Sequence, residues 1–310
     1  MLKQDDLRKG KTKPQTIFIL VANHNGAYVP ELPYIHPIQV GAANTEKRFS
    51  NMLQDDIGDH ISARNSSYCE LTAVYWAWKN VQADYIGLFH YRRFLSFDQH
   101  RKTEKDGFIH MTELNQAAIN TLHLTPQNMQ NYIVKHDIVM MRPINVFDMT
   151  AGNCLTVRQQ FDIVPQHRPQ DLTKAVEILS VMYPDYIQDA KRYLDGEKAF
   201  YCNMFIMKQE LFHTYCQWLF PILDQLYIYQ RNNYTEQMGT YEERLVGFIA
   251  ERLQGIFITH LKRTQRSIRI GYLPPVLFTE KTTVNQQNRI PWYKMEVRRQ
   301  RMRTKNTKNS

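Results

Sequence analysis

The residues best suited to chemistry stand at the end of one apolar run. Residues 84–95 read Asp-Tyr-Ile-Gly-Leu-Phe-His-Tyr-Arg-Arg-Phe-Leu, so a run typical of a buried strand ends in His90, Tyr91, Arg92 and Arg93. Such groups are costly at a strand end unless an anion meets them. Arginine offers a planar fork of donors that matches phosphate oxygens, and histidine adds a further donor. We therefore predict that His90, Arg92 and Arg93 bind the diphosphate of a sugar nucleotide.

Strand geometry predicts how these side chains are displayed. Because successive residues of a strand face opposite sides, His90 and Arg92 should share one face, and Tyr91 and Arg93 the other. Many nucleotide-sugar transferases carry Asp-x-Asp at this place to hold a divalent cation, whereas this chain carries cationic groups that can neutralise a diphosphate themselves. We therefore expect turnover without a metal cofactor. The alternative is an ordinary ion pair at a strand end.

Polar residues in two other apolar segments are further candidates. The run Thr16–Ala22, typical of a buried first strand, ends in Asn23 and His24, which we place near the nucleotide. Asn203 interrupts the run Ala199–Met207, which predicts a buried strand, and its amide needs a hydrogen-bond partner. That partner is either a substrate hydroxyl or a structural group.

Carboxylates form the third set of candidates, because inverting sugar transfer needs a base for the acceptor proton. Glu243 and Glu251 are eight residues apart, so they lie roughly on one face of the helix predicted over residues 242–253. Asp195 is a further candidate base. Arg244 and Glu251 can instead form a structural network within the same helix.

The positive charge of the chain is concentrated at its two ends. Residues 289–310 carry a net +7 and residues 1–13 a net +3, out of +9 for all 310 residues, which leaves the remainder at −1. A nucleic-acid groove requires basic density on the folded body, so we expect no nucleic-acid partner. The basic tail suits an anionic membrane surface, at about 1 kcal/mol per Lys or Arg, or is a solvated end.

Membrane and cysteine signals point to an ordinary cytoplasmic protein. No run approaches the ~20 apolar residues of a membrane span, and residues 1–14 are polar rather than signal-like. The cysteines show neither Cys-x-x-Cys spacing nor a dense framework, so we expect reduced thiols rather than a zinc site or disulfides. They are Cys69, Cys154, Cys202 and Cys216.

Strand and helix patterns alternate along the chain and predict an α/β fold with a largely parallel central sheet flanked by helices. We expect a single domain over residues 14–288, between a flexible basic N-terminus over 1–13 and a basic tail over 289–310. The Ser67-x-x-Glu70 pattern predicts a capping box at the start of a helix that ends near Asn80. The other predictions are strands at Tyr85–Phe89, Asp137–Met141 and Gly255–Thr259, a weaker strand at Tyr34–Val40, and helices from Thr125-Pro126, at Thr156–Ile163, at Gln170–Leu194 with a break at Tyr183-Pro184, and at Glu210–Tyr229.

Several of these segments together resemble one family. They occur in the family's order over residues 16–260, and the His-Tyr-Arg-Arg block is the most specific of them. The chain is thereby similar to the bacterial capsular-polysaccharide and O-antigen glycosyltransferases, a family first catalogued as a domain of unknown function. The segments are Pro37–Ala42, Asp56–Asp59, Ile61–Asn65, Tyr68–Thr72, Tyr75–Asn80, Gly87–Arg93, Tyr201–Met207 and Gly247–Leu253.

The resemblance implies a fold related to the GT-A type of nucleotide-sugar transferase. It also implies transfer of a hexose, with galactose in its pyranose or furanose form among the family's sugars, from a UDP-sugar to a lipid-linked glycan. That glycan would belong to a capsule, O-antigen or lipooligosaccharide, built at the inner face of the cytoplasmic membrane. We assign Asp59, Asn65 and Asp84 to the donor site as well, and Asn203 with Arg244 to the sugar or acceptor.

Two other classes of function stay open on the sequence. A non-catalytic sugar-nucleotide or glycan-binding module would bind the donor without hydrolysing or transferring it. A nucleic-acid-binding protein would depend on the basic tail, so removing residues 289–310 would abolish its binding.

Overall fold

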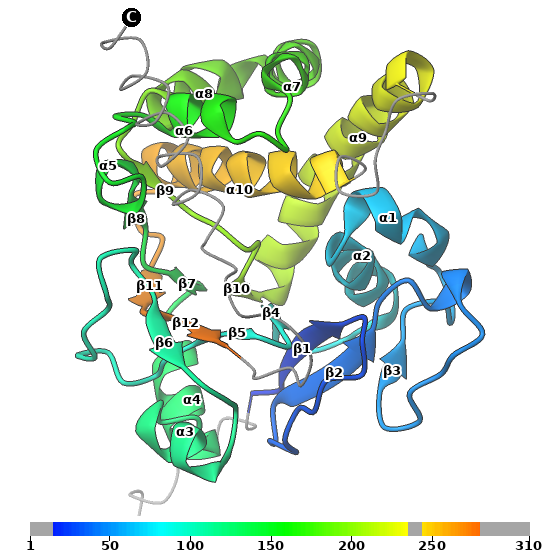
Figure 1. The fold of residues 1–310 in the computed structure, drawn as a ribbon, viewed down its shortest axis with the longest axis vertical. Helices are drawn as coiled ribbons and strands as arrows, with labels where there is room; N and C mark the ends of the chain where they lie inside the picture. Colours follow the sequence, from blue (N-terminus) through cyan, green and yellow to red (C-terminus); the bar gives the residue numbers. More distant parts are fainter. Residues whose placement is uncertain (1–14, 235–243, 280–310) are drawn as a thin grey trace, which may run out of the picture.

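A path of seven strands forms the spine of a ten-stranded sheet (Figure 1). The computed structural model describes residues 15–234 and 244–279. Every residue of β4 and all but one of β1 are buried, as expected of strands covered on both faces. In spatial order the strands are β11 (Ile270–Leu273), β7 (Ile138–Met141), β10 (Phe205–Lys208), β4 (Tyr85–His90), β1 (Ile17–Asn23), β2 (Ile35–Gln39) and β3 (Leu53–Gln54).

The strand directions bring three segments to one edge of this sheet. β1 and β4 run parallel, and Ala22 pairs with His90, so both strands end at the same edge. β10 runs antiparallel to β4, with Phe205 opposite Leu88. The turn that precedes β10 therefore lies at the edge where β1 and β4 end. In open α/β sheets, the carboxyl edge is where ligands bind.

A smaller branch of the sheet continues from β4. β5 (Arg93–Leu95) turns back on β4 and pairs with β12 (Pro275–Phe278), which also pairs with β6 (Ile109–Met111). A separate two-stranded sheet joins β8 (Ile144–Asn145) and β9 (Lys198–Ala199). The sequence pattern does not predict β5, β6, β11 or β12, because segments this short carry no readable periodicity.

Helices pack on the sheet and enclose its carboxyl edge. α9 contacts β4 and β10, and it also packs against α2 and α10. In Figure 1 these three helices lie above the sheet, while α3 and α4 lie below it. The helices are α1 (Asn65–Tyr68), α2 (Leu71–Asn80), α3 (Gln116–Thr121), α4 (Pro126–Ile133), α5 (Val146–Met149), α6 (Val157–Ile163), α7 (Pro169–Met182), α8 (Ile187–Leu194), α9 (Gln209–Tyr234) and α10 (Leu245–Thr264).

Two of the predicted helix starts and the predicted helix break are confirmed. Thr125 is the N-cap of α4, and Thr156 caps α6 through a capping box that it forms with Gln159. The break at Tyr183-Pro184 separates α7 from α8. The predicted α/β fold, with a largely parallel sheet flanked by helices, is also confirmed, and β10 is the antiparallel strand at its centre.

Three local predictions are wrong, each for a physical reason. The helix predicted over residues 67–80 is two helices, because Cys69 has a φ of 51° and Glu70 makes no capping hydrogen bond. The strand predicted at Gly255–Thr259 belongs to α10, since a short apolar run does not distinguish a strand from a buried helix. The strand predicted at Ala199–Met207 is divided into β9 and β10 by a turn.

A buried arginine anchors α10. The side chain of Arg252 is 1% exposed, and its guanidinium donates to Glu251 at 2.6 Å and to Gln160 at 2.6 Å. The same group lies over the rings of Phe161 and Tyr201. Because an unpaired buried charge is strongly destabilising, these contacts fix the turn of α10 that carries Glu251.

His167 packs beside this arginine and is held neutral. Its ring centroid lies 4.2 Å from that of Phe161 and 4.6 Å from that of Phe248. Burial, assisted by Arg252, lowers the pKa of His167 to about 2. The pKa of an unfolded histidine is about 6.5, so below that pH the unfolded chain binds a proton that the native protein excludes.

We predict that the free energy of unfolding falls as the pH drops below about 6.5, with His167 contributing at most about 1.4 kcal/mol per pH unit. His167→Phe keeps the aromatic stack and should flatten this part of the pH dependence. Urea unfolding of both proteins, followed from about pH 8 down to pH 5, measures the slopes. The two curves should run parallel at the alkaline end, and equal slopes at the acid end would contradict the prediction.

Candidate functional site

β4 and β5 form a tight hairpin that carries the predicted cationic group. β4 ends at His90, Tyr91 and Arg92 form the turn, and Arg93 opens β5 and pairs with His90. Residues directly opposite in an antiparallel pair have side chains on the same face. His90 and Arg93 therefore share a face, and the predicted pairing of His90 with Arg92 is wrong because the strand does not continue through the motif.

His90 is held in one tautomer by a backbone carbonyl. The side chain is buried, and its Nε2 lies 2.5 Å from the carbonyl oxygen of Cys202. A carbonyl oxygen only accepts, so Nε2 carries the hydrogen. Burial lowers the pKa of His90; the Glu70 carboxylate opposes this shift, and Arg93 and Arg244 reinforce it. His90 is therefore neutral at physiological pH, with Nδ1 unprotonated.

The turn before β10 connects several elements through hydrogen bonds. The backbone N–H of Cys202 donates to Glu251 Oε1 at 2.7 Å. The Asn203 amide donates to Glu70 Oε1 at 2.8 Å and to the carbonyl oxygen of Gly247 at 3.3 Å. Asn203 is completely buried, and its Oδ1 has no hydrogen-bond partner among the residues that the structure describes. One turn thus joins the hairpin, the start of α2 and the first half of α10.

Backbone strain is concentrated at this junction. Cys202 and Asn203 have φ values of 66° and 49°, and Cys69, which precedes Glu70, has a φ of 51°. Left-handed φ values are unfavourable for residues other than glycine and persist only where the surroundings enforce them. Such strain is typical of sites that hold a functional geometry.

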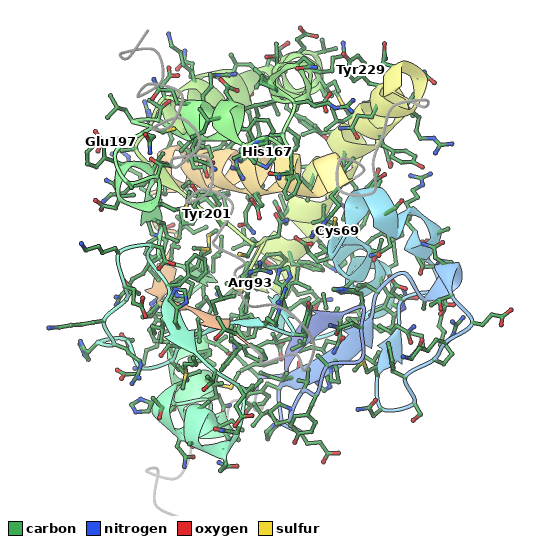
Figure 2. All side chains as sticks on the ribbon, viewed as in Figure 1. Cys69, Arg93, His167, Glu197, Tyr201 and Tyr229 are labelled. Atoms are coloured by element: carbon green, nitrogen blue, oxygen red, sulfur yellow. The ribbon has the colours of Figure 1, made fainter. Side chains whose placement is uncertain are left out.

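Two carboxylates, Glu70 and Glu251, form a cluster with His90, Arg93, Cys202 and Asn203. Glu251 is 16% exposed, and burial raises its pKa although the neighbouring Arg252 opposes the shift. The charge of Glu70 acts on both Glu251 and Arg93. Cys202 and the two carboxylates raise the pKa of Arg93. Figure 2 shows Arg93 in the region between the sheet and α10.

A second group of polar side chains lies around Tyr91 in the hairpin turn. The guanidinium of Arg92 lies over the Tyr91 ring, with 5.1 Å between Cζ and the ring centroid. The edge of His24 meets the same ring at 5.3 Å between centroids. Burial, Arg244 and Arg92 together lower the pKa of His24. Arg92 Nε is buried without a hydrogen-bond partner in the described part of the chain, while Arg244 Nε contacts Cys69 Sγ at 3.3 Å.

Asn23 and Asn65 support the surrounding loops. The Asn23 side chain is buried, donates to the Ala27 carbonyl at 2.7 Å, and accepts from the backbone N–H groups that follow it. The Asn65 amide donates to the Cys69 carbonyl at 2.7 Å and to Thr72 Oγ1 at 3.2 Å. These bonds shape the His24 loop and the strained junction at Cys69.

Asp59 and Asp84 lie away from the cluster. Asp59 lies in an exposed loop and accepts from the Tyr75 hydroxyl at 3.2 Å. The same loop bonds to the last residue of α2. The cluster contacts the opposite end of that helix. Asp84 accepts from the backbone N–H of Thr16 at 2.7 Å, at the start of β4. A strand of this length separates it from His90 by ~20 Å. We therefore leave both carboxylates out of the candidate site.

The acids predicted as the catalytic base lie in different parts of the chain. Asp195 is the C-cap of α8, its side chain is exposed, and none of the contacts that join the cluster involves it. Glu243 lies outside the residues that the structure describes, as do the basic segments 1–13 and 289–310. Of the two predicted bases within the described residues, Glu251 bonds to the turn before β10, whereas Asp195 does not.

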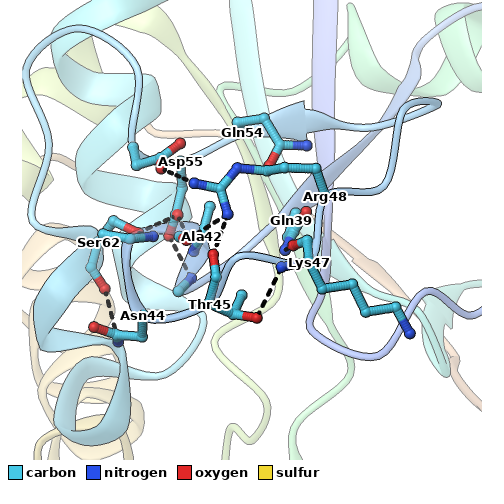
Figure 3. Close-up of polar contacts among 12 residues, drawn as sticks. Gln39, Ala42, Asn44, Thr45, Lys47, Arg48, Gln54, Asp55 and Ser62 are labelled. Atoms are coloured by element: carbon cyan, nitrogen blue, oxygen red, sulfur yellow. Dashed lines mark hydrogen bonds and ion pairs between the residues drawn. The ribbon is translucent and has the colours of Figure 1, made fainter.

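A neighbouring polar network fixes the loop after β2 (Figure 3). Asp55 is completely buried and accepts from the backbone N–H groups of Gly41 and Ala42 at 2.9 and 3.0 Å and from the Ser62 hydroxyl at 2.5 Å. Arg48 donates to the Ala42 carbonyl at 2.9 Å. Three of the segments that carried the family resemblance lie in or beside this polar network.

A surface hollow of about 550 Å³ lies elsewhere, beside the loop between β1 and β2. Its lining includes Tyr28, Pro33, His36 and Asn51, and it shares no residue with the cluster. The cluster is the better candidate site, because it combines buried titratable groups, arginines and strain at the carboxyl edge.

Residues 15–234 and 244–279 contain neither a metal-binding cluster nor a membrane-spanning helix. There, no group of three His, Cys, Asp or Glu side chains is arranged to hold a metal ion. No helix in this part of the chain combines the length and the apolar character needed to cross a bilayer. Cys69, Cys154, Cys202 and Cys216 are free thiols in this structure.

Two members of the cluster were not recognised as functional candidates in the sequence. Glu70 matches a capping-box pattern, which accounts for it without any functional role. The carbonyl of Cys202 becomes a partner of His90 only through the turn before β10, which the apolar sequence around it conceals. The one available signal was the polar Asn203 next to it.

Comparisons with known proteins show the family of the chain and one solved structure with a similar fold. A solved structure described as the apo form of the bifunctional glycosyltransferase WbbM superposes with a TM-score of 0.78 and 28% sequence identity, covering 88% of this chain and 48% of that one. The chain thus spans about half the length of that protein. A comparison with curated protein sequences finds no significant match. The family model described as "Domain of unknown function (DUF4422)" matches residues 18–263, which include the whole cluster, and the chain belongs to that family.

Proposed function

We propose that the protein is a glycosyltransferase that transfers a hexose from a UDP-sugar to a lipid-linked surface glycan. The observation that carries the proposal is the gathering of Arg92, Arg93 and Arg244 around the edge where β1 and β4 end. The similarity to WbbM supports glycosyl transfer in general. Galactose, as pyranose or furanose, is the proposed sugar because of the family resemblance.

The diphosphate of the donor would occupy the arginine group. Arg92 Nε has no hydrogen-bond partner among the described residues, so an anion would satisfy a buried donor that the protein leaves open. Guanidinium forks bind phosphate oxygens in pairs, and they can offset the charge of the departing UDP. His24 and Tyr91 lie beside Arg92, which supports a nucleotide position next to the loop after β1 in this proposal.

The sugar and the acceptor would lie toward the turn before β10. Asn203 has an unpartnered Oδ1 there, and Arg244, at the start of α10, contacts the Sγ atom of Cys69, the residue before Glu70. His90, neutral and bonded to the Cys202 carbonyl, would hold this turn in register with Arg93. A lipid-linked acceptor would bring the protein to a membrane surface, with the basic tail as the proposed contact.

We predict that Arg93→Ala weakens the binding of UDP-galactose by about 1.5 to 3 kcal/mol, the loss expected for a charged hydrogen bond to phosphate. Arg92→Ala should act in the same direction, and Lys at either position should rescue poorly because it lacks the planar fork. Titration calorimetry of the folded variants measures the affinity.

Arg266→Ala is the matched control, since this arginine is exposed and removing it changes the net charge equally. The control should bind as the unmodified protein does. Unchanged affinity in both hairpin variants would show that the arginines do not hold the diphosphate. Binding without any release of UDP, with every acceptor tried, would favour the non-catalytic binding module instead.

We further predict that turnover needs no divalent metal, because fixed guanidinium groups supply the positive charge at the leaving diphosphate. UDP release from UDP-galactose should be the same in excess EDTA, and after Mg²⁺ or Mn²⁺ is added back. Loss of activity in EDTA that either metal restores would refute this prediction and would point to carboxylates that assemble only with the donor bound.

A further inference from the structure

We propose that Glu70 is the catalytic base that removes the proton from the acceptor hydroxyl, so that transfer inverts the anomeric configuration. This inference rests on the proposed function and assigns the step to a residue that the sequence pattern explains as a helix cap. Among the carboxylates that the fold brings to the cluster, the base must have an oxygen available to a substrate.

One oxygen of Glu70 is anchored and the other is open. Oε1 accepts from the Asn203 amide at 2.8 Å, and Oε2 has no hydrogen-bond partner among the described residues. The Asn203 amide is itself fixed, because Asn203 is completely buried and also donates to the Gly247 carbonyl. The Glu70 side chain is only partly buried. A base needs this combination of fixed orientation and access.

The position of Glu70 at the start of α2 also suits a base. This residue is the N-cap of α2, where the positive end of the helix stabilises a carboxylate. The charge of Glu70 acts on titratable groups from several elements: Cys69 after α1, His90 and Arg93 on the hairpin, Cys202 in the turn, Tyr215 on α9 and Glu251 on α10. An acceptor hydroxyl beside Glu70 would therefore be close to a sugar whose diphosphate is held by the hairpin arginines.

The rival acids fit the role less well. Both oxygens of Glu251 are bonded within the protein, to the Cys202 N–H at 2.7 Å and to Arg252 at 2.6 Å. Burial raises the pKa of Glu251, which favours proton uptake, but both of its oxygens are already engaged by donors of the protein. Glu251 is better described as a positioning residue that holds the turn, and Asp195 is exposed outside the cluster.

The step balances without a further reactant. The acceptor oxygen forms a bond to C1 of the donor sugar while the bond from C1 to the diphosphate oxygen breaks, and that electron pair leaves with UDP. The acceptor proton passes to Glu70 Oε2 and is later released to water. Because the nucleophile enters on the face opposite the leaving group, a β-linked product forms from an α-linked donor, and an α-linked product from a β-linked donor.

The test uses Glu70→Gln in the full chain, with UDP-galactose as donor and octyl β-galactoside as acceptor. Glutamine keeps the shape and can still accept from Asn203 through Oε1, but it cannot take a proton. We expect kcat for transfer to fall by about 100-fold or more, the range typical of a lost general base. The Kd for UDP-galactose, measured by calorimetry, should change by less than about twofold because the ground-state donor contacts remain.

Glu70→Asp and Glu251→Gln are the companion variants. The Asp variant keeps a carboxylate and should retain more activity than the Gln variant, whereas Glu251→Gln should lower the stability of the fold along with activity. NMR of the wild-type product should show inverted configuration. The proposal is overturned by near-normal kcat in Glu70→Gln, by equal losses in the Asp and Gln variants together with weakened donor binding, or by retained configuration. Absence of turnover in the wild-type protein would contradict the proposed function itself.

Discussion

The turn at Cys202 and Asn203 is the joint on which the candidate site depends. The backbone N–H of Cys202 donates to Glu251 on α10, and its carbonyl accepts from His90 at the end of β4. The side-chain amide of Asn203 donates to Glu70 at the start of α2. Elements that are distant in the sequence are thereby fixed to one another at the carboxyl edge of the sheet. Left-handed residues other than glycine cost on the order of 1–3 kcal/mol each, so the strain persists because the hydrogen bonds and the packed surroundings oppose its release.

The charges around this joint are arranged to receive an anion. Arg252 forms an ion pair with Glu251 and neutralises its charge. Because Arg252 is itself buried between aromatic rings, the pair is part of the scaffold. His90 is neutral, and the negative charge of Glu70 partly offsets the positive charges of the arginines on the hairpin and at the start of α10. A diphosphate would complete this balance, and the donors are held in place before it arrives, which is the condition for effective electrostatic stabilisation.

The sequence predicts which strand ends in the cationic group better than it predicts how the side chains of that group are displayed. The apolar run that stops at His90 identified a buried strand and its cationic end, because burial and charge leave clear compositional signals. The turn of the hairpin left no such signal, since Tyr91 and Arg92 are not typical turn residues, and the predicted faces were therefore wrong. Asn203 was recognised as an anomaly, but the strand around it was not, because an apolar turn buried under α10 has the composition of a strand. Glu70 was assigned to a capping box, since a local pattern cannot reveal a partner far along the chain.

Hydrogen–deuterium exchange of the protein with and without UDP-galactose tests the central claim most directly, because it reports where the donor orders the backbone without any mutation. The account predicts slower exchange on donor binding in peptides that cover residues 88–95, 200–205 and 244–252, which meet at the turn. Slower exchange confined to the surface hollow around residues 28–37, with these three segments unchanged, would contradict it.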